Sequence, residues 1–83
     1  MERLTEKTPE GGWRLVGATE AAARKLAAFE EMQQAVRAER DEVCGRLERL
    51  RAEGKTKSVT FQQLLSEKLL LTNLIDRFGL WGL

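Results

Sequence analysis

The stretch TFQQLLSEKLLLTNLIDRF, from Thr60 to Phe78, decides the fold of this chain. At about 100° per residue, the large apolar side chains of such a helix cover well over half of its circumference. One neighbouring helix covers a stripe of roughly 100°, so this helix has more apolar surface than a single neighbour buries. Those side chains are Phe61, Leu64, Leu65, Leu69, Leu70, Leu71, Leu74, Ile75 and Phe78.

Both ends of this helix carry sequence signals. Thr60 is a residue type that caps helix N-termini, and Gln63 stands where it completes a capping box. Gly79 follows Phe78 and suits the left-handed residue just after a helix. The sequence therefore predicts a helix over 60–78, roughly 28 Å long.

The sequence pattern predicts a second, longer helix over residues 19–53. Phe29, Val36, Val43 and Leu50 recur every seven residues, and Leu26, Gln33, Arg40 and Leu47 occupy the companion positions of the same heptads. This pattern is typical of a coiled-coil seam, here with a polar centre. Gly54 suits the residue after the helix, and five loop residues suit a turn between antiparallel helices. We therefore expect an all-α fold built on an antiparallel helical hairpin, 19–53 and 60–78.

Residues 1–18 are predicted to form a separate N-terminal part, ahead of the helical hairpin and apolar tail of residues 19–83. Pro9 and the following glycines favour a turn between the short runs at Arg3–Thr5 and Trp13–Val16. This turn predicts a small β-hairpin, and an extended arm is the alternative.

With 83 residues the chain is near the size at which a single core gives little net stability. We therefore expect a homodimer or larger helical bundle that shelters the leucine-rich helix. In the C-terminal tail, Trp81 adds another large apolar side chain to this surface. The expected interface residues are Leu65, Leu69, Leu70, Leu74 and Trp81.

Composition argues against catalysis. The chain has no histidine and one cysteine, Cys44, so the usual general base, a histidine metal ligand and an intrachain disulfide are all missing. The neighbouring carboxylates Glu30 and Glu31 would diverge by about 100° on a helix. We expect no enzyme activity, no cofactor and no metal site. Polar residues interrupt the apolar helix, so we expect no membrane span, and nothing near Met1 resembles a secretory signal.

The loop between the helices is the one basic feature that invites a ligand. Arg51, Lys55, Lys57 and Ser58 stand beside the N-terminus of the second helix, a position that favours anions. The Gly-Lys-Thr triplet is not a phosphate-binding loop, because Arg49 stands where that motif needs a glycine. The loop is thus either an anion or partner site or a polar turn without a ligand.

Parts of the sequence resemble small proteins of phages and prophages of clostridia-like bacteria. The resemblance lies in the opening Met1–Thr5, in Lys25–Glu30, in Gly54–Thr60 with the Leu-rich helix, and in the ending Gly82–Leu83. It implies a bacterial cytoplasm under phage influence, where small helical proteins often act by binding.

We therefore expect a non-enzymatic binding protein that inhibits or regulates a host macromolecule, as a counter-defence (anti-CRISPR-like) factor would. One alternative is a nucleotide or nucleic-acid binder, including a sponge for a signalling nucleotide, that uses the basic loop. Another is a structural or assembly subunit.

Overall fold

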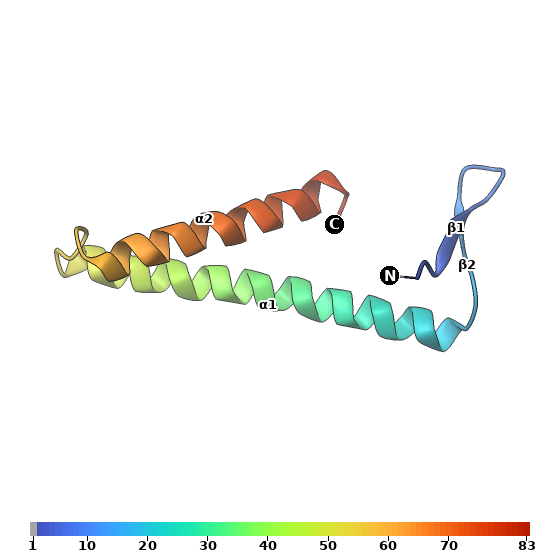
Figure 1. Cartoon of the computed structure of the whole chain (residues 1–83), viewed down its shortest axis with the longest axis horizontal. Coiled ribbons are helices and arrows are strands. Elements are labelled where there is room, and N and C mark those ends of the chain that lie inside the picture. Colours follow the sequence, from blue (N-terminus) through green and yellow to red (C-terminus); the bar gives the residue numbers. More distant parts are fainter. Residues whose placement is uncertain (1) are drawn as a thin grey trace. The chain divides into compact units, whose positions relative to one another are not determined.

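The structure is a computed structural model that describes residues 2–83. Its elements in chain order are β1 (Thr5–Lys7), β2 (Trp13–Leu15), α1 (Thr19–Ala52) and α2 (Val59–Leu80) (Figure 1). The two expected helices are confirmed, and a short two-stranded sheet precedes them. Contacts divide the chain into two compact units, residues 1–32 and residues 33–83, and α1 runs through both.

The first unit begins with the β-hairpin, one of the two alternatives for the N-terminal residues. The strands pair antiparallel, with Thr5 opposite Leu15 and Lys7 opposite Trp13. In the connecting turn the Gly11 N–H donates to the Thr8 carbonyl at 3.0 Å, with Pro9 at the second turn position. Gly11 follows with a φ of +86°, the left-handed conformation that a three-residue hairpin loop needs at this place.

Exposed side chains stabilise this hairpin only weakly. Arg14 forms an ion pair with Glu6, directly across the two strands. The guanidinium of Arg3 lies over the indole of Trp13, 5.3 Å from the ring centroid, and Trp13 remains 60% exposed. Isolated two-stranded hairpins are marginal in water. Contact with the first turns of α1 within the same unit therefore has to add to its stability.

The second unit contains the buried core. Here α2 runs back along the second half of α1 (Figure 1). Of the residues that the structure describes, every buried apolar side chain belongs to this unit. The core cluster lies near the loop, where Leu50 and Leu71 pack against Val43, Leu47, Phe61 and Leu64. Val36, Ile75 and Phe78 are also buried, farther from the loop along the two helices.

The heptad pattern accounts for this burial. In α2 the inward positions follow a three–four spacing, Phe61, Leu64, Lys68, Leu71, Ile75 and Phe78, and all are buried or half-buried. In α1 the predicted polar centre is present, because Gln33 and Arg40 are half-buried between apolar positions. Arg40 donates to Asp41 at 3.1 Å. The seam is therefore a two-helix coiled coil with cations, Arg40 and Lys68, near its middle.

Glycine closes α1 as predicted. Gly54 has a φ of +72°, its N–H donates to the Arg51 carbonyl at 3.1 Å, and the Lys55 N–H donates to the Leu50 carbonyl at 2.8 Å. This pair of bonds is a Schellman motif, which satisfies carbonyls that the helix itself leaves open.

The cap of α2 differs from the prediction. Ser58, not Thr60, is the N-cap: its backbone is extended, and its hydroxyl accepts the Phe61 N–H at 3.1 Å. The same hydroxyl donates to the Lys55 carbonyl at 2.9 Å. Thr60 lies inside the first turn and is exposed. Both residue types suit a cap, and the bond from Ser58 back to the loop favours the earlier one.

The end of α2 also lies later than predicted. The helix continues through Gly79 to Leu80, and Gly82 takes the left-handed role with a φ of +78°. The Gly82 N–H donates to the Gly79 carbonyl at 3.0 Å, and the Leu83 N–H donates to the Phe78 carbonyl at 2.9 Å. The prediction of Gly79 as the terminating residue was therefore wrong, and a second Schellman motif fixes the tail against the helix end.

Candidate functional site

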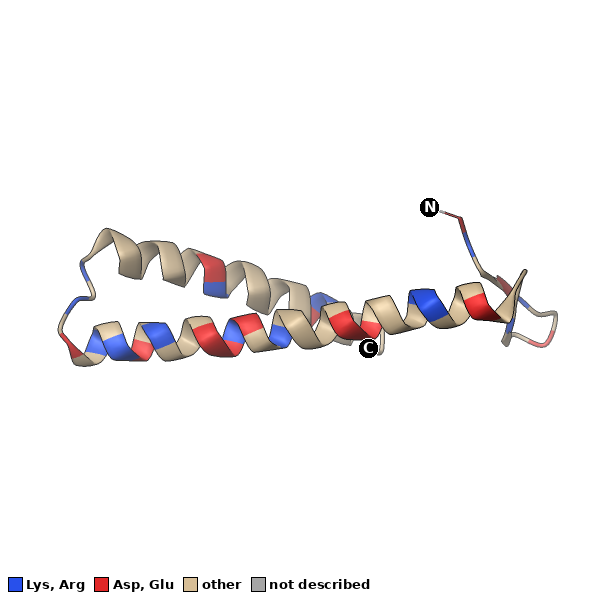
Figure 2. Ribbon diagram, turned by 90° about the horizontal axis from the view of Figure 1, so that it is seen from below, with Lys and Arg blue, Asp and Glu red and all other residues tan. Residues whose placement is uncertain are grey.

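The candidate site is the part of α2 that the hairpin leaves uncovered. Most charged residues are in α1 and the loop, whereas α2 has few (Figure 2). Inside the second unit α1 covers only the inward positions of α2. Large apolar side chains remain exposed on both flanks of the helix.

These exposed side chains form two strips. The Leu69 strip consists of Leu65 and Leu69, which are 39% and 58% exposed. The Leu70 strip consists of Leu70, Leu74 and Trp81, which are 71%, 40% and 77% exposed. Within a strip, residues four apart differ by about 40° around the helix, whereas Leu69 and Leu70 differ by about 100°. The strips therefore lie on opposite sides of the buried seam.

All five residues predicted as an oligomer interface are thus exposed or partly exposed, but they do not share one face. Leu65 and Leu74 point about 180° apart around the helix axis. A single flat partner cannot cover both strips. The geometry instead provides two separate apolar surfaces, one on each flank of α2.

The Leu70 strip continues into an ordered tail. Leu80 is 84% exposed and Leu83 is 54% exposed, and the hydrogen bonds of the second Schellman motif hold both next to Trp81. Because the tail backbone is already fixed, a partner that binds Trp81 has less conformational entropy to remove. Rigid aromatic side chains of this kind often anchor protein interfaces.

The basic loop is largely engaged within the chain. Lys55 forms an ion pair with Glu53 at 3.0 Å, and Arg51 forms one with Glu48 at 2.8 Å. Ser58 caps α2, so its hydroxyl and the Phe61 N–H are already engaged with each other. Lys57 is the predicted loop cation without an ion pair among residues 2–83. These contacts reduce the attraction for an anion.

A small hollow beside the loop contains basic residues that the sequence prediction missed. It has a volume of about 170 Å³ and lies between Arg46 and Arg49 of α1, Glu53 just after its end, and Thr60 and Leu64 of α2. Ligand pockets commonly measure roughly 300–1,000 Å³, so this hollow is smaller than a typical ligand pocket. The spacing of Arg46 and Arg49, one helical turn apart, was the signal that could have identified them.

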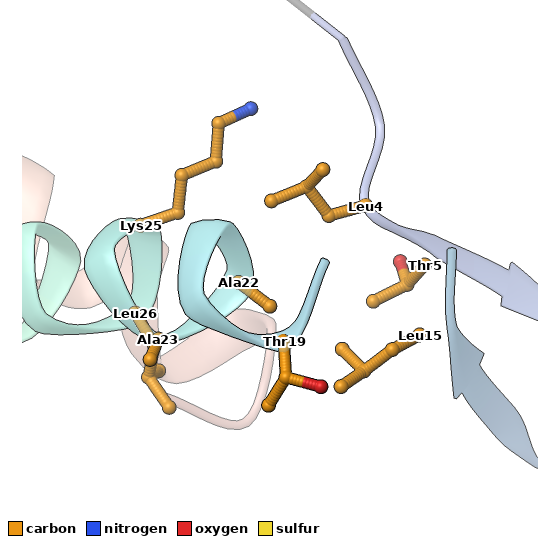
Figure 3. Close-up of a pocket in the computed structure, with 8 residues that line it drawn as sticks. All are labelled: Leu4, Thr5, Leu15, Thr19, Ala22, Ala23, Lys25 and Leu26. Atoms are coloured by element: carbon orange, nitrogen blue, oxygen red, sulfur yellow. The ribbon is translucent and has the colours of Figure 1, made fainter. Parts of the chain in front are cut away.

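The first unit has a larger apolar groove of about 490 Å³. Leu4, Thr5 and Leu15 of the hairpin face Thr19 and Ala22 of α1 across it, and Leu26 and Ala23 extend it along the helix (Figure 3). Lys25 stands at its rim, where its Nζ donates to the Glu2 carbonyl at 2.7 Å. The groove has no charged group in its floor.

Between residues 2 and 83 no group of three or more cysteine, aspartate or glutamate side chains is placed to bind a metal ion. None of the helices in this range has the length and apolar character that crossing a membrane requires. Comparisons with protein-family models, curated proteins and solved structures found no match to this chain.

Proposed function

We propose that this chain is a non-enzymatic binding protein that inhibits or regulates another protein, and that the Leu70 strip is the surface that binds it. The observation that carries the proposal is the exposure of Leu70, Leu74 and Trp81 on one side of a capped helix. Large contiguous apolar patches on a protein surface commonly mark interaction sites.

The spacing of the strip supports a particular mode of binding. Leu70, Leu74 and Trp81 recur at i, i+4 and i+11, so they lie within about 40° of each other around the helix axis. A helix that presents such a line of apolar anchors binds by inserting them into a groove of its partner. Arg77, at i+7 in the same series, places one charged group between Leu74 and Trp81 within the strip.

The resemblance to phage and prophage proteins suggests the setting. In a bacterial cytoplasm under phage influence, the partner would be a host macromolecule, and a component of host defence is the most direct target for inhibition. The absence of histidine from the sequence supports action by binding. We also propose that the chain assembles as a homo-oligomer, because its two strips cannot both be covered by one partner face.

A nucleotide or nucleic-acid site at the loop is the second candidate. Residues 46–57 contain Arg46, Arg49, Arg51, Lys55 and Lys57 against Glu48 and Glu53, a net charge of +3. The internal ion pairs of Arg51 and Lys55 argue against it. If the loop does bind anions, Lys55→Glu with Lys57→Glu abolishes binding to short oligonucleotides, and rising salt weakens it.

Affinity capture from bacterial lysate tests the main proposal. The wild-type chain should retain one specific host protein, and Leu70→Glu with Trp81→Glu should lose it. Leu65→Glu with Leu69→Glu is the matched control, because it places the same two charges on the opposite strip. Capture that is equal for all three chains would contradict the assignment of the Leu70 strip. A chain that retains only further copies of itself would instead support a structural or assembly subunit.

A further inference from the structure

The apolar groove of the first unit is a feature that the proposed function does not use. It lies within residues 1–32, between the β-hairpin and the first two turns of α1 (Figure 3). Its volume of about 490 Å³ falls within the roughly 300–1,000 Å³ that ligand pockets commonly measure. The groove is therefore large enough for a small molecule, whereas the hollow beside the loop is not.

The walls of the groove are apolar on both sides. Thr5 and Leu15 are directly opposite each other in the two strands, so their side chains share one face of the hairpin. Ala22 and Leu26 are four residues apart and share one side of α1. In Figure 3 the side chains of Leu4 and Leu15 point from the hairpin towards Ala22. Because alanine ends at its methyl group, a narrow apolar molecule can lie close to the helix there.

These walls gain from being covered. Leu15 is 51% exposed and Leu26 is 60% exposed, one on each side of the groove. Removal of such apolar surface from water is favourable. The hairpin is marginal by itself, and a molecule that contacts both Leu15 and Leu26 would join it to the helix. A ligand that binds only the folded form stabilises that form.

Lys25 supplies the charged end of the groove. It is the charged residue among those that line it. Its Nζ donates to the Glu2 carbonyl, a neutral acceptor, and forms no ion pair with any residue from 2 to 83. Glu20 is already paired with Arg24. An ammonium group has three donors, so Lys25 can also bind an anionic group at this end of the groove.

We propose that the groove binds a linear alkyl carboxylate, a fatty acid, with its carboxylate at Lys25 and its alkyl chain along Ala22 towards Leu15. The groove extends along α1 from Thr19 to Leu26, which is about 10 Å at 1.5 Å per residue. An extended chain advances about 1.2 Å per single bond, so about eight bonds span this length. A medium-chain acid such as decanoate therefore fits, and this site is separate from the Leu70 strip.

Titration calorimetry of the purified full chain with decanoate, below its micelle-forming concentration, tests the proposal. We expect one decanoate per chain, tighter binding than for octanoate, and weaker binding of uncharged 1-decanol. Each methylene that the groove covers should tighten binding by up to about fourfold. In amide NMR spectra, decanoate should shift the signals of β1, β2 and residues 19–26 and leave those of α2 in place.

Matched variants test the position of the ligand. Ala22→Phe fills the groove and should weaken binding at least about tenfold. Ala28→Phe makes the same change at an exposed position that does not line the groove, and should leave binding unchanged. Lys25→Gln should weaken binding about two- to fivefold, because an exposed ion pair contributes little, and Lys25→Arg should restore it. Far-UV circular dichroism checks that every variant keeps the helical content of the wild type.

Several results would overturn this assignment. They are no binding of decanoate, equal binding of decanoate and 1-decanol, unchanged binding by Ala22→Phe, or NMR shifts confined to α2. Binding to vesicles of anionic lipid without binding of decanoate would show that the groove takes a membrane surface instead. Sedimentation that Ala22→Phe changes and decanoate does not would assign the groove to a second copy of the chain. Capture of a host protein is measured separately, so its failure contradicts only the proposed function.

Discussion

The guanidinium carbon of Arg51, in the last turn of α1, lies 5.6 Å from the ring centroid of Phe61, in the first turn of α2. Phe61 is buried, whereas Arg51 is exposed and also donates to Glu48 at 2.8 Å. Arg51 therefore links the two helices across the closed end of the hairpin and partly shields the ring from water.

Arg51→Ala should lower the free energy of unfolding by about 0.5–1 kcal/mol, the range of an exposed cation–π contact. Glu48→Ala removes only the ion pair and should cost less than about 0.5 kcal/mol, because exposed pairs contribute little. Urea unfolding followed by circular dichroism measures both. Equal effects of the two variants would show that the ion pair, not the ring contact, stabilises this end.

The observed cap gives a second prediction. Ser58→Ala removes the hydroxyl that accepts the Phe61 N–H and should cost about 1 kcal/mol. Thr60→Ala is the matched control, and it should change the free energy of unfolding by less than about 0.5 kcal/mol because Thr60 lies exposed within the helix. The same urea titration compares them. A larger loss for Thr60→Ala would reverse the assignment of the cap.

The cap shows where sequence reasoning reached its limit. Ser58 and Thr60 are both good capping residues, two positions apart, and only the bond from Ser58 to the Lys55 carbonyl favours the first. The end of α2 was misplaced for a similar reason, since both Gly79 and Gly82 can terminate a helix. The heptads, in contrast, predicted the seam correctly from Val36 to Leu50, because periodic burial depends on helix geometry and not on one local bond. Leu26, in the same register, is 60% exposed, because α2 does not reach that part of α1.

The candidate site was also predicted only in part. The excess apolar surface of α2 was evident from its leucines, and the separation into two strips follows from the 100° step between Leu69 and Leu70. The ion pairs of Lys55 with Glu53 and of Arg51 with Glu48 were not predictable, because flexible exposed side chains can choose among several nearby carboxylates. They change the interpretation of the loop more than any other contact.

Leu47 and Leu70 provide a third prediction, on core burial. Leu47 is 2% exposed and belongs to the core cluster, so Leu47→Ala should cost about 2–5 kcal/mol. For a domain of this size such a loss is comparable with the whole stability, and the chain should lose most of its cooperative thermal transition. Leu70→Ala, at 71% exposure, should leave that transition within a few degrees of the wild type. A mild effect of Leu47→Ala would contradict the assigned core.

Two glycines should respond in opposite directions to the same substitution. Gly45 lies in the interior of α1, and an added methyl group would meet nothing within 4 Å, so Gly45→Ala should stabilise the chain by about 0.5–1 kcal/mol. Gly54 has a φ of +72°, so Gly54→Ala should destabilise it by about 1 kcal/mol. Thermal unfolding of both variants checks the signs. A stabilising Gly54→Ala would be incompatible with the Schellman motif at that end.

Arg40 offers a prediction about specificity as well as stability. It occupies an inward heptad position and is half-buried, between Val36 and Val43 of the same seam. Arg40→Leu should raise the free energy of unfolding by about 1 kcal/mol or more, because an apolar side chain replaces a charged one in the seam. Polar residues at such positions fix register at a cost in stability, so the variant should also populate additional assembled species.

Urea unfolding measures the change in stability of Arg40→Leu, and sedimentation measures the change in assembly. Asp41→Ala is the control, since it removes the Arg40 ion pair without adding apolar surface, and it should produce neither effect.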